Sequence, residues 1–116
     1  MKSVFVVDDD PDQAEIMGQL LASRTRNVRT FSDPVRAMAA LAEGQADLLI
    51  ADLSLPWVDG TDVIKAAQQK HPELVIFLVS GYPRGPQIAQ ECGLRFFSKP
   101  VNYDELRACV DQALSG

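Results

Sequence analysis

Acidic, hydroxyl and ammonium side chains follow four short apolar runs in this sequence of 116 residues. The runs lie at residues 4–7, 48–51, 74–79 and 96–98, the last of which closes with a serine. The polar residues that follow them are, in chain order, Asp8 with Asp9, Asp52, Ser80 and Lys99. Continuous apolar runs of this length are typical of strands in a parallel sheet that is buried on both faces. Ligands bind beyond the carboxyl ends of such strands, so we expect these side chains to meet at one edge.

Three carboxylates at one edge of a sheet repel each other, which predicts a bound cation. Keeping Asp8, Asp9 and Asp52 ionised and close together costs several kcal/mol without a counterion. Oxygen ligands in an open pocket suit Mg²⁺ or Mn²⁺, whereas zinc would require nearby Cys or His. Because Mg²⁺ usually binds one or two carboxylates together with water and phosphate oxygens, the carboxylates indicate phosphoryl chemistry.

The remaining polar residues suit the transfer of a phosphoryl group. Lys99 supplies a compact positive charge for one phosphoryl oxygen, and the hydroxyl of Ser80 can donate a hydrogen bond to another. In-line transfer needs little beyond such placement of charge. Asp52, from the central part of the expected sheet, is the natural nucleophile.

Strand and helix signals alternate five times along the chain, which predicts an α/β fold. We expect strands at residues 2–7, 28–31, 47–51, 74–79 and 95–98. We expect helices at residues 11–24, 34–44 and 60–70, a short one that ends near residue 92, and a last one after Asn102. The Gly- and Pro-rich residues 81–86 are poor helix formers, so the fourth helix should be short.

Local signals place the helix starts and their buried faces. Asp10 is expected to cap the first helix, with Pro11 at its first position and Gln13 completing a capping box. In the second helix, the spacing of Val35, Met38 and Leu41 predicts that these residues point inward.

Composition and charge exclude several classes of protein. The net charge of −5 and the lack of a basic stripe argue against direct nucleic-acid binding. The one basic cluster, Arg24, Arg26 and Arg29, is interpreted as a solvated helix end and edge strand. No apolar run approaches the ~20 residues that span a bilayer, and we see no signal peptide. Cys92 and Cys109 lack metal-ligand or redox spacing and are expected to be buried or half-buried thiols in a reducing cytoplasm.

Taken together, the polar residues and their order resemble the receiver domain of bacterial two-component response regulators. The resemblance covers essentially the whole chain, and residues 1–116 are expected to form a single receiver domain. It rests on Asp8–Asp9, Asp52, the Leu55-Pro56 and Asp59-Gly60 pairs, Ser80, and Lys99-Pro100. It implies a doubly wound (βα)₅, flavodoxin-like fold with a parallel five-stranded sheet in the order 2-1-3-4-5.

The resemblance also implies an acceptor and a metal site. Asp52 would receive a phosphoryl group from a histidine kinase or a histidine phosphotransfer protein in a Mg²⁺-dependent reaction. Asp9, Asp52 and the backbone carbonyl of Ser54 would bind the metal directly, and Asp8 would bind it through a water molecule.

The same resemblance assigns roles on the fourth and fifth strands. Lys99 would pair first with Asp52 and then with the phosphoryl group, and the Lys99-Pro100 peptide bond is expected to be cis. Ser80 would move toward the phosphoryl group, and Phe96, as the switch aromatic, would turn inward behind it.

By this resemblance the chain is a signalling receiver that catalyses only its own phosphorylation and dephosphorylation. It would be monomeric or weakly dimeric and would change the surface that a downstream effector reads.

Two other functions remain open at this point. A phosphate-independent adaptor of the same fold would use the domain only as a docking surface, although an unused acidic cluster would then carry a repulsion without benefit. A small phosphatase of the haloacid-dehalogenase type would use Asp8 as nucleophile and Asp10 as the second aspartate. However, Pro11-Asp12 does not continue that motif, and 116 residues leave no room for a cap domain.

Overall fold

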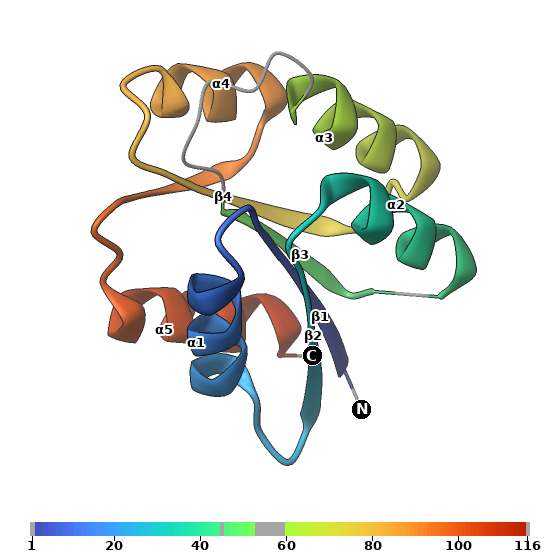
Figure 1. Cartoon of the computed structure of the whole chain (residues 1–116), viewed down its shortest axis with the longest axis vertical. Helices are drawn as coiled ribbons and strands as arrows, with labels where there is room; N and C mark the ends of the chain where they lie inside the picture. Colours follow the sequence, from blue (N-terminus) through green and yellow to red (C-terminus); the bar gives the residue numbers. More distant parts are fainter. Residues whose placement is uncertain (1, 45, 53–59, 116) are drawn as a thin grey trace.

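The computed structural model describes residues 2–44, 46–52 and 60–115, with backbone only for Pro34, Asp52 and residues 60–63 (Figure 1). The strands are β1 (Lys2–Asp8), β2 (Arg26–Phe31), β3 (Leu48–Asp52), β4 (Val75–Ser80) and β5 (Arg95–Ser98). The helices are α1 (Pro11–Leu21), α2 (Pro34–Glu43), α3 (Gly60–Lys70), α4 (Gly85–Cys92) and α5 (Tyr103–Leu114). The alternation of five strands with five helices that the sequence predicts is confirmed.

All five strands are parallel and lie in the predicted order β2-β1-β3-β4-β5. Helices cover both faces of the sheet, with α1 and α5 on one side and α2, α3 and α4 on the other (Figure 1). Alternate residues of each strand therefore face the two helix layers. This explains why the central strands are apolar throughout rather than alternating with polar residues.

Two apolar layers make up the core, one on each face of the sheet. The layer under α2, α3 and α4 contains Phe5, Val7, Ala37, Ala40, Leu41, Leu49, Ala51, Ile64, Ala67, Ile76, Leu78 and Ala89. The layer under α1 and α5 contains Val4, Val6, Met17, Leu21, Leu48, Ile50, Phe77, Val79, Phe97, Leu106 and Val110. The fourth helix has eight residues, which confirms that it is short.

The predicted inner face of α2 is wrong at one position. Val35 is 74% exposed, whereas Ala37, Ala40 and Leu41 are buried. Three residues fall about 60° short of a full helical turn, so Val35, two such steps before Leu41, lies about 120° away from it around the helix axis. The buried stripe is therefore centred on the alanines, and Val35 lies outside it.

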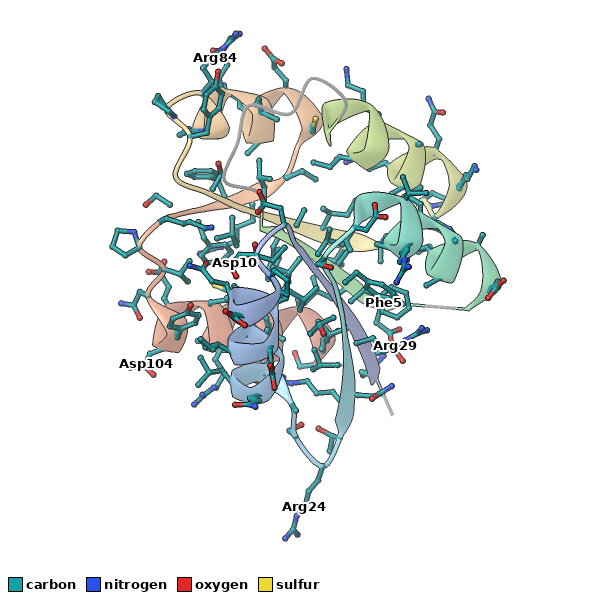
Figure 2. All side chains as sticks on the ribbon, in the orientation of Figure 1. Phe5, Asp10, Arg24, Arg29, Arg84 and Asp104 are labelled. Atoms are coloured by element: carbon teal, nitrogen blue, oxygen red, sulfur yellow. The ribbon has the colours of Figure 1, made fainter. Side chains whose placement is uncertain are left out.

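The basic cluster divides into different environments. Arg24 extends into solvent, as expected (Figure 2). Arg29 lies over two aromatic rings, with its Cζ 5.3 Å from the ring centroid of Phe5 and 5.2 Å from that of Phe31. The interpretation of Arg26 as a solvated residue is wrong, since it is only 9% exposed. Its Nη1 lies 2.6 Å from Oδ1 of Asp111 on α5.

Arg26 also explains why α1 ends at residue 21 rather than at residue 24. Its Nε donates to the carbonyl oxygen of Leu21, a group that a longer helix would use internally. Ala22 is already extended, and Ser23 pairs with Arg26 in a short bridge.

The two cysteines are free and half-buried, within the range expected. Burial raises the pKa of the Cys92 thiol above its ordinary value, with Lys65 acting in the opposite direction and Glu91 in the same one. In the described part of the chain, no helix is both long and apolar enough to cross a bilayer.

Replacing Arg26 with alanine should lower the free energy of unfolding by about 1–3 kcal/mol, because the Leu21 carbonyl loses its buried donor. Asp111 is 60% exposed and regains water, so it contributes little to that loss. Urea denaturation measures the change. Arg24→Ala, at an exposed position two residues earlier, should change stability by less than about 0.5 kcal/mol, and equal losses in the two variants would contradict this account.

Candidate functional site

The polar residues singled out in the sequence lie at one edge of the sheet. Asp8 and Asp52 are register partners at the ends of β1 and β3. Ser80 ends β4 and pairs with Ser98 on β5, and Lys99 follows directly. Because β1, β3, β4 and β5 are consecutive neighbours, the backbones of these residues line the carboxyl edge of the sheet in one row.

The first two acidic residues have different surroundings. Asp8 is fully buried, and its Oδ1 accepts a hydrogen bond from the backbone N–H of Asp10 at 2.9 Å. Asp9 is exposed. The buried carboxylate is therefore held in a defined orientation, and the exposed one faces solvent at the same edge.

Asp10 caps α1 as expected, but the capping box is only half formed. Its Oδ1 accepts from the N–H groups of Asp12 at 3.0 Å and Gln13 at 3.4 Å. The reciprocal bond, in which the Asp10 N–H would donate to the Gln13 side chain, does not form because that N–H donates to Oδ1 of Asp8, so that part of the prediction is wrong. The freed amide oxygen of Gln13 lies 3.5 Å from Nζ of Lys99.

Lys99 crosses the edge from β5 to α1. A β-carbon built on Gly81 would lie 3.4 Å from Cβ and 3.9 Å from Cδ of Lys99, so the lysine stem runs alongside Gly81. The Lys99 N–H donates to the carbonyl of Ser80 at 3.1 Å, and the Lys99–Pro100 peptide bond is cis. Since the ammonium reaches Gln13, the side chain extends past the strand ends that lie between β5 and β1.

Ser80 is buried, with 3% of its surface exposed. Its Oγ accepts from the backbone N–H of Tyr82 at 3.0 Å, which fixes the first turn of the loop after β4. A hydroxyl that accepts one bond still has a proton to donate, so this contact is compatible with donation to a phosphoryl oxygen.

Phe96 is half-buried and packs against the core layer under α2, α3 and α4. Its ring lies against Gly85, the first residue of α4. Sequence reasoning assigned neither Gly85 nor Gln13 to the site, and it gave Gln13 only a role in the capping box. The sequence signal that could have identified Gln13 is its position in the first turn of the helix that follows the acidic pair. The signal for Gly85 is the occurrence of a glycine at the first position of a helix.

One predicted ligand cannot be placed. Ser54, expected to contribute its carbonyl, and the Leu55-Pro56 and Asp59 motif positions lie outside the described residues. Among the side chains that the structure describes, which do not include that of Asp52, no three from His, Cys, Asp or Glu are grouped so as to hold a metal ion. The donors that the described edge offers are carboxylate oxygens from Asp8 and Asp9, a set that suits Mg²⁺ or Mn²⁺.

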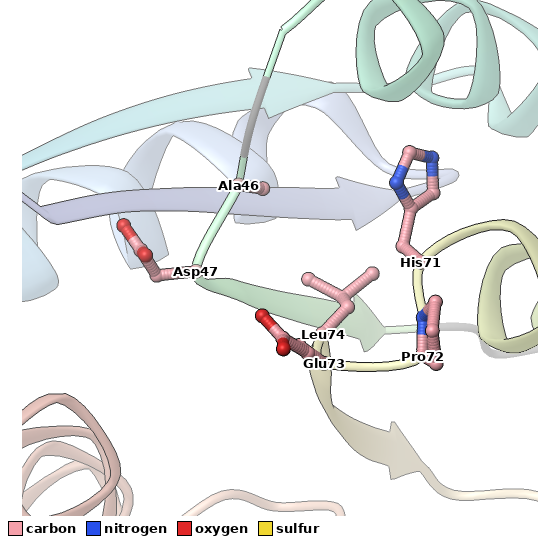
Figure 3. Close-up of a pocket in the computed structure, with 6 residues that line it drawn as sticks. All are labelled: Ala46, Asp47, His71, Pro72, Glu73 and Leu74. Atoms are coloured by element: carbon pink, nitrogen blue, oxygen red, sulfur yellow. The ribbon is translucent and has the colours of Figure 1, made fainter.

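A pocket of about 330 Å³ lies at the opposite end of the sheet (Figure 3). It is lined by Ala46, Asp47, His71, Pro72, Glu73 and Leu74. Asp47 is already engaged, since its Oδ2 accepts from the N–H of Ser3 at 2.8 Å. The pocket adjoins the amino ends of β3 and β4, away from the edge where parallel sheets bind ligands.

Comparison with known proteins gives a match over almost the full chain. The family model of the response regulator receiver domain matches residues 4–111. The DNA-binding transcriptional regulator NtrC of Salmonella typhimurium is 30% identical over 115 residues, covering 97% of this chain and 24% of that protein. The C4-dicarboxylate transport transcriptional regulatory protein DctD of Rhizobium meliloti is 32% identical over 107 residues, with coverages of 90% and 23%. The chain thus spans about a quarter of the length of these curated relatives.

Solved structures show the same fold. The signal receiver domain of an HD domain-containing protein from Pseudomonas fluorescens is 27% identical, with a TM-score of 0.85 and coverages of 97% and 94%. The response regulator protein TrrA from Thermotoga maritima, solved in complex with Mg²⁺ and BeF, is 26% identical. Its TM-score is 0.84, and the match covers 98% of this chain and 100% of that one.

Replacing Ser80 with alanine should lower the free energy of unfolding by about 1 kcal/mol, because the Tyr82 N–H loses its acceptor. Ser80→Thr keeps the hydroxyl and should retain most of that stability. Chemical denaturation of both variants checks the difference. Ser98→Ala, the exposed register partner on β5, is the matched control, and a loss there as large as in Ser80→Ala would argue against the Tyr82 contact.

Proposed function

The chain belongs to the family of response regulator receiver domains, and from that premise we propose that it is a phosphorylation-controlled switch whose phosphate acceptor is Asp52. The observation that carries this proposal is the row of residues at the carboxyl edge. Asp8, Asp52 and Ser80 end three neighbouring strands, and the Lys99 side chain extends across the same edge to Gln13.

The proposed transfer forms one bond and breaks one bond. A carboxylate oxygen of Asp52 attacks phosphorus, and the bond from phosphorus to the donor nitrogen of a phosphohistidine breaks in line. The leaving imidazole takes the electron pair, and Asp52 becomes an acyl phosphate. Hydrolysis by water returns the carboxylate and releases inorganic phosphate, so the chain catalyses only its own modification.

Lys99 and Ser80 stabilise the charge that the transfer moves. The ammonium of Lys99 reaches across the strand ends, where it can leave the amide oxygen of Gln13 for a phosphoryl oxygen. The Ser80 hydroxyl donates to a second oxygen, and Phe96 then turns inward behind it. The side chains of Lys99 and Ser80 already border the carboxyl edge of the sheet, which supports these roles.

The carboxylates of this edge fit a divalent cation. We assign Asp9, Asp52 and the Ser54 carbonyl as direct ligands of Mg²⁺ or Mn²⁺, with Asp8 acting through water. When bound, the cation would neutralise charge on the carboxylates and on the phosphoryl oxygens. The fixed orientation of the buried Asp8 carboxylate and the exposure of Asp9 support this assignment.

The partners follow from the chemistry of the acceptor. The phosphoryl donor is a histidine kinase or a histidine phosphotransfer protein, and a downstream effector reads the phosphorylated surface. Residues 1–116 act as one receiver domain, cytoplasmic, monomeric or weakly dimeric, without direct binding of nucleic acid or membrane. The named relatives are transcriptional regulators about four times as long, so an output through another domain of a longer protein is part of the proposal.

The phosphatase alternative is disfavoured by the surroundings of Asp10. A second aspartate that acts as acid and base must face the substrate, whereas Asp10 uses Oδ1 to cap two N–H groups of α1. A phosphate-independent adaptor would bind its partner equally well with and without Mg²⁺ and with Asp52 replaced by asparagine.

Incubation with acetyl phosphate and Mg²⁺ should add the mass of one phosphoryl group to the wild-type protein, and none to Asp52→Asn. The amide cannot form the acyl phosphate, so intact-mass spectrometry gives a clear difference. Asp47→Asn, at the other end of the same sheet, is the matched control and should label like wild type. Equal labelling of Asp52→Asn would refute the assignment of the acceptor.

Asp9→Asn should weaken Mg²⁺ binding by about tenfold or more, since a direct carboxylate ligand becomes a neutral amide. Isothermal titration calorimetry measures the affinity, and labelling by acetyl phosphate should fall in parallel. Asp12→Asn changes a nearby exposed carboxylate on α1 that the proposal leaves outside the metal site, and it should bind Mg²⁺ nearly as wild type does. An equal loss of Mg²⁺ affinity in the two variants would contradict the assignment of Asp9 as a direct ligand, because the loss would then reflect only the change in net charge.

A further inference from the structure

The first residue of α4 and the ring of Phe96 approach each other more closely than any side chain at that residue would allow. Gly85 is buried, and a β-carbon built on it would lie 2.7 Å from Cε1 and 3.1 Å from Cζ of Phe96. The same β-carbon would lie 3.3 Å from Cβ of Ser80. Helix, ring and strand end therefore meet at one point that only glycine leaves open.

Backbone conformation does not explain this glycine. Among the described residues, Gly93 is the one with a positive φ, at 71°. Gly85 thus has a backbone that other residues could adopt, and glycine is a poorer helix former than alanine. By contrast, a β-carbon on Gly44 would meet nothing closer than the Ala40 carbonyl oxygen at 3.7 Å. Space for the Phe96 ring distinguishes Gly85 from Gly44; Gly18 has a similar close contact, but with Cγ2 of Thr30 at 2.8 Å, away from the candidate site.

Two consecutive hydrogen bonds join the same helix start to the Ser80 hydroxyl. The N–H of Tyr82 donates to Oγ of Ser80 at 3.0 Å, and the N–H of Gly85 donates to the carbonyl of Tyr82 at 2.9 Å. Only residues 81–84 separate β4 from α4. A displacement of the hydroxyl therefore shifts the turn that carries Gly85.

We propose that Gly85 is a positioning residue of the phosphorylation site, and that its missing side chain forms the seat of the Phe96 ring. The seat couples the position of Ser80 to the ring and to the start of α4. This inference rests on the proposed function for the movement of Ser80 toward a phosphoryl group. With a methyl group in the seat, the ring is forced outward and the phosphorylated conformation is disfavoured.

A double-mutant cycle with a phosphoryl mimic tests the coupling. The proteins are wild type, Gly85→Ala, Phe96→Leu and the double variant, each titrated with beryllofluoride and Mg²⁺ by calorimetry. Gly85→Ala should raise the Kd by about tenfold, the size expected for one overpacked contact. Leucine lacks the two ring atoms that contact the seat, so in the Phe96→Leu background the added methyl meets only Cβ of Ser80, at 3.3 Å, and should change the Kd much less, by about twofold. Gly44→Ala is the matched glycine control and should bind as wild type.

Urea unfolding of the same proteins without the mimic separates the seat from the signalling role. The urea midpoint should fall in Gly85→Ala, and adding Gly85→Ala to Phe96→Leu should produce a much smaller fall, because only the contact with Cβ of Ser80 remains. An equal fall of the midpoint in the wild-type and Phe96→Leu backgrounds, or no fall in either, would overturn the proposal that the Phe96 ring occupies the seat. Failure of the wild type to bind beryllofluoride would instead overturn the proposed function, while the unfolding cycle would still decide whether the ring occupies the seat.

Discussion

The parallel pairing of β1 with β3 places two aspartates side by side at one edge of the sheet, and the other site residues are arranged around them. Asp8 and Asp52 are register partners on adjacent strands, which run about 4.8 Å apart. Two acidic residues at neighbouring strand ends favour positive charge at the same edge. Asp8 receives the N–H of Asp10, and Lys99 extends its ammonium across the strand ends. The pairing of β1 with β3 thus brings negative charge to the same edge at which the Asp10 N–H and the Lys99 ammonium lie.

The start of α1 belongs to this arrangement and is more than a helix cap. Because Asp8 takes the N–H of Asp10, the second half of the capping box cannot form. The Gln13 side chain is then available to approach Lys99 at 3.5 Å. The capping box therefore fails here because the buried Asp8 carboxylate takes the N–H of Asp10 that the Gln13 side chain would otherwise accept. The competition leaves the Gln13 amide oxygen beside the Lys99 ammonium.

The fold and the position of the candidate residues at the carboxyl edge could be predicted because both depend on the ends of apolar runs. A buried parallel strand leaves a strong signal, and the residue after it reaches the carboxyl edge wherever the strand lies. What failed depends on contacts between distant segments. Arg26 is buried between the end of α1, where the Leu21 carbonyl accepts from it, and Asp111 on the last helix. The exposure of Val35 depends on which side of α2 meets the sheet. The space at Gly85 exists only once Phe96 is packed against it.

The short segment between β4 and α4 holds the start of α4 close to the end of β4. Residues rich in glycine and proline shorten the helix to eight residues, which removes part of the surface that a longer helix would offer. They also bring the helix start within two hydrogen bonds of the Ser80 hydroxyl. A loop this short has little freedom to absorb a displacement at one end. In the function proposed above, a displacement of the Ser80 hydroxyl would therefore move the start of α4 and the Phe96 ring together, and the proposed effector surface would lie where these two elements meet.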